Sequence, residues 1–112
     1  MTESSKDPEE DMELYDLRVT VESIEGRSVC GLSVGDYVEL TDSSRLSMPA
    51  GRHFCMYALA AVLPLLPAKQ RQLPPSDWLE QDSLVACPDP EERLIMRISR
   101  GDRRAMRSSD LT

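Results

Sequence analysis

Apolar residues occupy every second position in two stretches near opposite ends of the chain. Leu17, Val19 and Val21 alternate with polar residues, and Leu94, Met96 and Ile98 alternate with Arg97 and Ser99. A period of two is typical of a strand that buries one face. The pattern therefore predicts two half-buried strands. Shorter strands are expected over residues 37–40 and 84–87.

A helical period appears in the middle of the chain. Apolar residues fall into two neighbouring rows, which together cover more than half of a helix circumference: Phe54, Ala58, Ala61 and Leu65, then Cys55, Leu59, Val62 and Leu66. Pro64 and Pro67 limit the extension of this helix. We expect a mostly buried helix from about Arg52 to Leu63.

Turn signals separate these elements. Thr41–Gly51 is rich in Ser, Asp and Pro and is expected to be a loop, whereas Pro88–Glu92 is expected to join the last two strands as a hairpin. The elements then follow the order strand–strand–helix–strand–strand. This order predicts an α+β fold, with a small antiparallel sheet packed on one mostly buried helix.

A chain of 112 residues is expected to fold as one domain. Residues 1–12 are acidic and are expected to form a disordered leader. Residues 13–101 hold all the predicted elements and form the single α+β domain. Residues 102–112 contain Arg103, Arg104 and Arg107, and we expect a flexible Arg-rich tail.

The net charge is −7, which argues against nonspecific binding to nucleic acid because phosphates repel such a surface. The longest apolar run, residues 54–67, is too short to cross a bilayer and contains prolines. The acidic N-terminus has no apolar segment typical of a signal peptide. These features predict a cytoplasmic protein that is not bound to a membrane.

The sequence contains few residues of the kind that enzymes use, apart from its three cysteines. Cys30, Cys55 and Cys87 are each predicted at an element boundary, where functional side chains are often presented. Thiolates are soft ligands for zinc, copper(I) or iron–sulfur clusters. Three thiolates leave a fourth position open for water, substrate or His53, the only histidine. No Cys-x-x-Cys pair is present, and ordinary buried cysteines are the alternative.

Several pieces of the sequence occur in a characteristic order: the strand Leu17–Val21, Cys30, Val34-Gly35-Asp36, Cys55 before the apolar helix, and Ala86-Cys87-Pro88-Asp89 before the last strand. In this order they resemble a family of small uncharacterised prokaryotic domains. Cysteines recur at the same three places in that family, which implies a shared thiolate role. Gly31 and Met56 stand where the family tends to have prolines, and the family's histidine before Gly-Asp is absent here. His53 would have to substitute for that histidine.

Two functions are consistent with these features. In the first, Cys30, Cys55 and Cys87, with His53, form a thiolate site that holds a metal or an iron–sulfur cluster, or that handles sulfur, in a small accessory protein. In the second, the domain is a non-catalytic interaction module with structural cysteines, and it binds a protein partner or its own copy through a sheet edge or the Arg-rich end. An enzyme that uses only Cys55 and His53 is disfavoured because residues two apart on a helix point in different directions.

Overall fold

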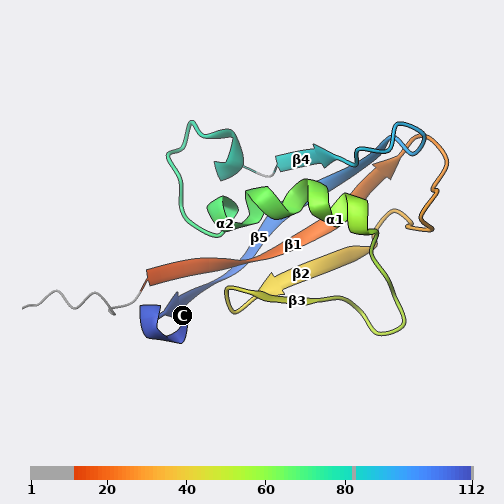
Figure 1. Cartoon of the computed structure of the whole chain (residues 1–112). Helices are drawn as coiled ribbons and strands as arrows, with labels where there is room; N and C mark the ends of the chain where they lie inside the picture. The colour runs from red at the N-terminus through yellow and green to blue at the C-terminus, as the bar shows by residue number, and fades with distance from the viewer. Residues whose placement is uncertain (1–11, 82, 112) are drawn as a thin grey trace, which may run out of the picture.

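The computed structural model describes residues 12–81 and 83–111. Two long strands, β1 (Met12–Ile24) and β5 (Leu94–Met106), form the centre of a five-stranded antiparallel sheet with the order β3-β2-β1-β5-β4. The other strands are β2 (Tyr37–Thr41), β3 (Arg45–Ser47) and β4 (Ser83–Ala86). Helix α1 (Met56–Val62) lies across one face of this sheet (Figure 1).

The two alternating stretches form strands, as predicted, and these strands pair with each other at the centre of the sheet. Val19 lies opposite Ile98, and Val21 lies opposite Met96. Most apolar side chains of both strands are buried on the covered face of the sheet, whereas the residues between them are exposed or half-buried. The alternation is thus a direct consequence of a sheet with one covered face.

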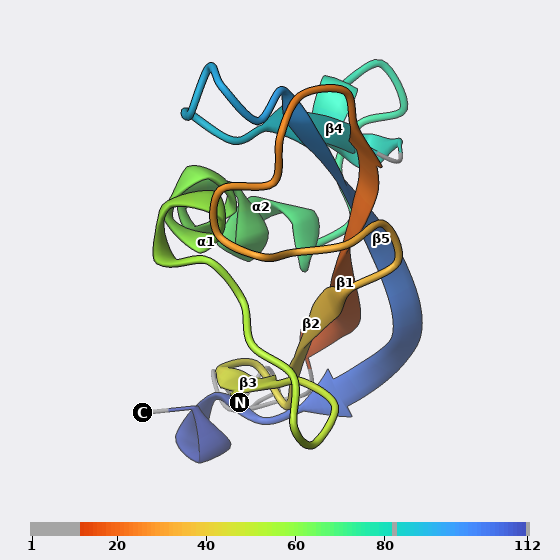
Figure 2. The same cartoon turned by 90° about the vertical axis from the view of Figure 1, so that its right-hand side faces the viewer.

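The helical layer is broken by its prolines. Helix α1 is followed by a 3₁₀ turn, Leu63–Leu65, and by the short helix α2 (Leu66–Lys69), each with proline near its start. Ala58, Val62 and Leu66 are buried against the sheet. Seen along the strands, the helical layer covers one side of the sheet but does not extend over β3 (Figure 2).

The α+β class, the antiparallel sheet and the helix are confirmed, but the predicted order of elements is wrong. Three strands precede the helix in the described part of the chain, because β3 lies within the expected loop. All three residues of β3 are exposed, so they carry no apolar alternation. The helix also starts later than predicted, since Cys55 is in an extended conformation (φ −74°, ψ 131°).

The ends of the central strands lie in regions that we expected to be unstructured. The expected Arg-rich tail belongs to β5 as far as Met106, and Met106 pairs with Met12. A 3₁₀ turn, Ser108–Asp110, follows. The expected leader lies outside the described residues except for Met12, the first residue of β1.

Arg100 of β5 holds the connection from the helical layer to β4. Its guanidinium donates hydrogen bonds to the carbonyls of Lys69 and Arg71 and to the carboxylate of Glu80, at 2.6–3.0 Å. It also stacks on the ring of Tyr15, 4.4 Å from the ring centre. No helix in the described ranges is long and apolar enough to cross a membrane.

Candidate functional site: three cysteines around a buried glutamate

Three separate segments bring the cysteines to one cavity. Cys30 lies in the loop after β1, Cys55 immediately precedes α1, and Cys87 follows β4. The cavity has a volume of about 330 Å³ and is lined mainly by apolar surface, with two acidic residues: its walls are Val29, Cys30, Cys55, Met56, Tyr57, Cys87, Asp89 and Glu92. All three cysteines have free thiols.

Glu92 is the centre of this cluster. This residue is only 1% exposed. One carboxylate oxygen accepts the backbone N–H groups of Val29 and Cys30, at 2.8 and 3.1 Å, and the Cys30 thiol at 3.1 Å. The other oxygen faces the Cys87 thiol at 3.5 Å. One carboxylate therefore connects two of the three cysteines.

Backbone contacts hold the Cys30 loop against the turn that carries Glu92. The Gly26 N–H donates to the Glu92 carbonyl at 2.8 Å, and the Arg27 N–H donates to the Glu91 carbonyl at 3.2 Å. A side chain at Gly26 would place its Cβ only 2.0 Å from the Glu91 carbonyl oxygen. Glycine is needed here because the two backbone segments approach so closely.

The surroundings keep two of the thiols protonated. Burial raises the pKa of the Cys30 thiol to about 12, and the hydrogen bond to Glu92 and the nearby Cys55 side chain add to this rise. Burial also raises the pKa of Cys87, again with a contribution from Glu92. A protonated thiol is a poor nucleophile. These two cysteines therefore act as hydrogen-bond donors at neutral pH.

The pKa of Glu92 shifts in the opposite direction from the pKa values of the two thiols. Burial raises its pKa, but the thiol and amide hydrogen bonds from Cys30, with those from Cys87 and Val29, outweigh this effect and hold the pKa below its ordinary value. The carboxylate is therefore charged at neutral pH. Among the described residues it forms no ion pair, so its hydrogen bonds come entirely from neutral groups.

His53 is close to the cluster but does not line the cavity. Its Nε2 atom lies 2.9 Å from the carbonyl oxygen of Cys30, so this nitrogen carries the proton and donates it. The neighbouring residue Arg52 forms an ion pair with Asp36, whose carboxylate also accepts the Ser33 N–H at 2.9 Å. Together these contacts hold the Cys30 loop from its solvent side.

The geometry departs from the predicted ligand set in two respects. His53 binds the backbone of Cys30, whereas Glu92, which the sequence did not single out, contacts the thiols of Cys30 and Cys87 directly. Among residues 12–81 and 83–111, no three His, Cys, Asp or Glu side chains stand in a position to hold one metal ion. As the side chains lie, the thiols of Cys30 and Cys87 are placed to donate hydrogen bonds to Glu92.

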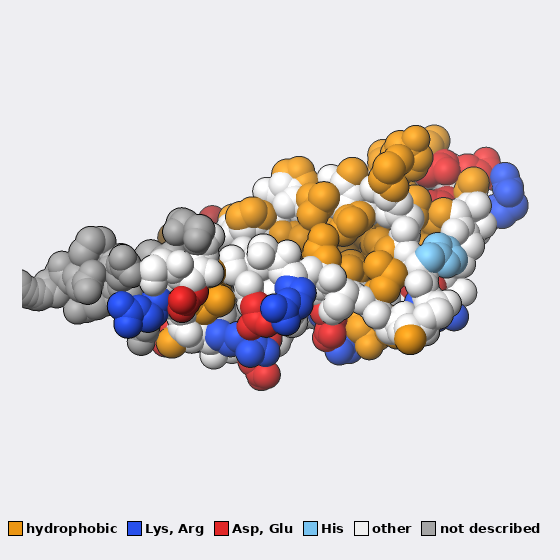
Figure 3. Space-filling model, turned by 60° about the horizontal axis from the view of Figure 1, so that its bottom comes forward, with side chains coloured by type: hydrophobic (Ala, Val, Ile, Leu, Met, Phe, Trp, Pro, Cys, Tyr) orange, Lys and Arg blue, Asp and Glu red, His pale blue; other side chains and the backbone are white. Residues whose placement is uncertain are grey.

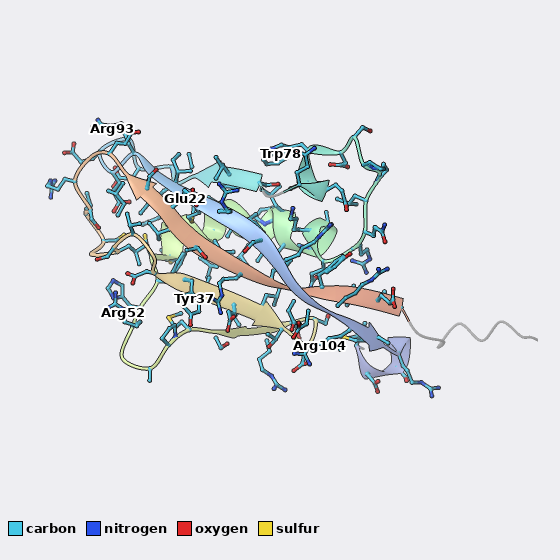
Figure 4. All side chains as sticks on the ribbon, turned by 180° about the vertical axis from the view of Figure 1, so that it is seen from behind. Glu22, Tyr37, Arg52, Trp78, Arg93 and Arg104 are labelled. Carbon is cyan, nitrogen blue, oxygen red and sulfur yellow. The ribbon has the colours of Figure 1, made fainter. Side chains whose placement is uncertain are left out.

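Two further hollows lie away from the cysteines. An apolar groove of about 190 Å³ separates the β2–β3 hairpin from the helical layer, and hydrophobic side chains gather in the middle of the molecular face shown in Figure 3. The opposite face of the sheet is polar: Glu22 and Tyr37 lie on it (Figure 4), and Glu22 binds Arg97 at 3.0 Å. A second hollow, of about 350 Å³, lies over β1, β2 and β5 and is lined mostly by polar residues, among them Asp16, Arg18 and Glu39. Neither hollow contains a cysteine.

No protein-family model, curated protein or solved structure matches this chain. The resemblance to a family with three recurring cysteines therefore stays an expectation from the sequence.

Proposed function

We propose that Cys30, Cys55 and Cys87, together with Glu92, bind a soft divalent metal ion such as zinc, and that the chain is a small cytoplasmic accessory protein that carries this site. The observation that carries the proposal is that three thiols and one buried carboxylate meet at a single cavity, where no described cation pairs with the carboxylate. Buried charges are normally paired or bound to metals. A metal ion would supply the missing positive charge.

The chemistry of the donors supports a metal more than metal-free sulfur chemistry. Sulfur transfer needs a nucleophilic thiolate, but burial raises the pKa of both Cys30 and Cys87. The raised thiol pKa does not prevent metal binding, because a metal ion deprotonates a thiol that coordinates it. Three thiolates and one carboxylate also carry the same charge as the four thiolates of a structural zinc site.

Metal binding would exchange one set of interactions for another. The three thiols would lose their protons and turn their sulfur atoms towards the ion at about 2.3 Å. The thiols of Cys30 and Cys87 would rotate away from their hydrogen bonds to Glu92. The carboxylate would keep the amide bonds from Val29 and Cys30. Its second oxygen, which has the Cys87 thiol as its hydrogen-bond partner among the described residues, is the one available to the metal.

The first test is elemental analysis of protein purified without oxygen. We expect one metal ion per chain in the natural sequence and loss of that metal in Cys30→Ser, Cys55→Ser, Cys87→Ser and Glu92→Gln. Glu91→Gln is the matched control, because Glu91 precedes Glu92 but is exposed. Cobalt(II) substitution adds a second readout, since thiolate coordination produces an intense absorption band.

The same experiment separates the other versions of the site. Iron with equimolar or greater sulfide would replace the single metal ion with an iron–sulfur cluster. Absence of metal, with three thiols that titrate freely, would overturn the proposal. That result would favour an interaction module, which the exposed Val29, Met56 and Tyr57 at the cavity mouth would then serve.

A further inference from the structure

Strand β4 is a free edge of the sheet. It pairs with β5 on one side, and no described strand lies on its other side. Its sequence, Ser83-Leu84-Val85-Ala86, has no charged residue. Sheet edges that avoid association usually carry charges, prolines or a covering segment. The opposite edge strand, β3, carries Arg45 and differs in this respect.

The phase of the hydrogen bonds shows which backbone groups of β4 point outward. The Cys87 N–H donates to the Leu94 carbonyl at 2.9 Å, and residues of an antiparallel pair alternate between bonded and non-bonded positions. With Val85 opposite Met96, residues 83, 85 and 87 direct their backbone groups towards β5. Leu84 and Ala86 therefore direct both their N–H and C=O groups away from the sheet.

The side chains of the same two residues are also accessible. Leu84 is 49% exposed, and its partner in the register, Arg97, lies on the polar face of the sheet. Trp78, which is 56% exposed, lies near the start of β4 (Figure 4). Val85 points the other way and packs at the margin of the core. The edge thus combines apolar side chains with backbone groups that have no partner among the described strands.

We propose that β4 pairs with β4 of a second copy of this chain, antiparallel and about a two-fold axis at Val85. In this register Leu84 lies opposite Ala86 of the second copy, so the four outward N–H groups of the two strands all meet outward carbonyls. The register centred on Ala86 is poorer, because it brings Leu84 opposite Pro88, which has no N–H. The edge is therefore self-complementary.

This pairing would make one continuous sheet of two chains. The two-fold axis runs perpendicular to the sheet, so both helices and both cysteine cavities lie on the same face of the dimer. Cys87 follows β4 directly, and the two Cys87 residues would stand about 14 Å apart at the usual spacings of strands and residues. The dimer would present two cavities side by side to one partner.

Dimer formation is tested by sedimentation across a range of protein concentrations. We expect the mass to rise from the 12.6 kDa of one chain to twice that value. Ala86→Pro removes an outward N–H without disturbing the ladder to β5, and we expect it to remain monomeric. Leu84→Lys places a charge on the same edge without touching the backbone, which keeps the test valid if the proline variant does not fold. Leu46→Lys on β3 is the matched control and should still dimerise.

Amide exchange gives a residue-level readout of the same proposal. On dilution, the Leu84 and Ala86 amides should lose protection together with the dimer, whereas the Val85 amide, which is bonded to β5, should keep it. A chain that stays monomeric up to about 1 mM, which corresponds to a binding free energy of only about −4 kcal/mol, would overturn the proposal. A dimer that persists in both Ala86→Pro and Leu84→Lys would overturn it equally.

Discussion

Replacement of Glu92 by alanine should destabilise the reduced, metal-free protein by about 3–4 kcal/mol. The carboxylate accepts two backbone N–H groups and two thiols. A hydrogen bond to a charged group contributes about 1.5–3 kcal/mol, and the thiols are weak donors. The two amide bonds therefore account for most of the loss, and water that enters the cavity offsets part of it. This loss is a large share of the roughly 5–15 kcal/mol that stabilises a small domain.

Glu92→Gln should cost less, about 1–2 kcal/mol, because the amide oxygen can still accept the N–H groups of Val29 and Cys30. The free energy of unfolding is measured by urea denaturation in the presence of reductant and chelator, and the slope with urea should stay constant. Glu91→Ala is the control. Glu91 is exposed, its side chain pairs weakly with Arg27 at 3.7 Å, and its carbonyl contact survives the change. A Glu92→Ala protein within about 0.5 kcal/mol of the natural one, the range of ordinary surface substitutions, would refute the reasoning.

Three further predictions follow from the same cluster. Because the folded state raises the Cys30 pKa from 9.0 to about 12, the stability that the neutral thiol contributes is complete below pH 9 and is lost as the pH rises from 9 to 12. Denaturation of Cys30→Ser across this range should lack that loss. At pH 7.5 iodoacetamide should alkylate Cys30 on the order of a thousandfold more slowly in the folded chain than in urea, as measured by mass spectrometry of digested protein. Gly26→Ala should destabilise the chain by about 2–3 kcal/mol, since its Cβ would overlap the Glu91 carbonyl oxygen, whereas Gly51→Ala, with no atom near its Cβ, should report only the backbone effect of a positive φ.

The covered face of the sheet could be predicted from the sequence, and the exposed strands could not. Residues 17–21 and 94–98 alternate because every second side chain must be buried beneath the helix. Strand β3 and the last part of β5 are exposed almost throughout, so nothing in their side chains distinguishes them from loops. Their strand conformation depends on hydrogen bonds to neighbouring strands. Strand β3 pairs with β2 across a short turn, and the end of β5 pairs with β1, which is distant in sequence.

The candidate site was predictable to a similar extent. Cys30, Cys55 and Cys87 were singled out because they were predicted at element boundaries, and the structure brings them to one cavity. Glu92 was missed because an acidic residue in a proline-rich turn is most simply a solvated one. It becomes buried only because Gly26 lets the loop after β1 approach this turn. The only available signal was its position five residues after Cys87, across the turn of the expected hairpin.

Stability measurements can also separate a ligand role of Glu92 from a purely structural one. If the carboxylate only holds the Cys30 loop, added zinc leaves the difference in stability between the natural protein and Glu92→Gln unchanged. If Glu92 binds the metal, zinc at a thousand times its dissociation constant should stabilise the natural protein by about 4 kcal/mol, and should stabilise Glu92→Gln much less. Cys55→Ser extends the argument, because Cys55 lines the cavity but is not one of the two thiols that donate to Glu92. It should lose the metal-dependent stabilisation while keeping most of its metal-free stability, a combination that a structural network centred on Glu92 does not produce.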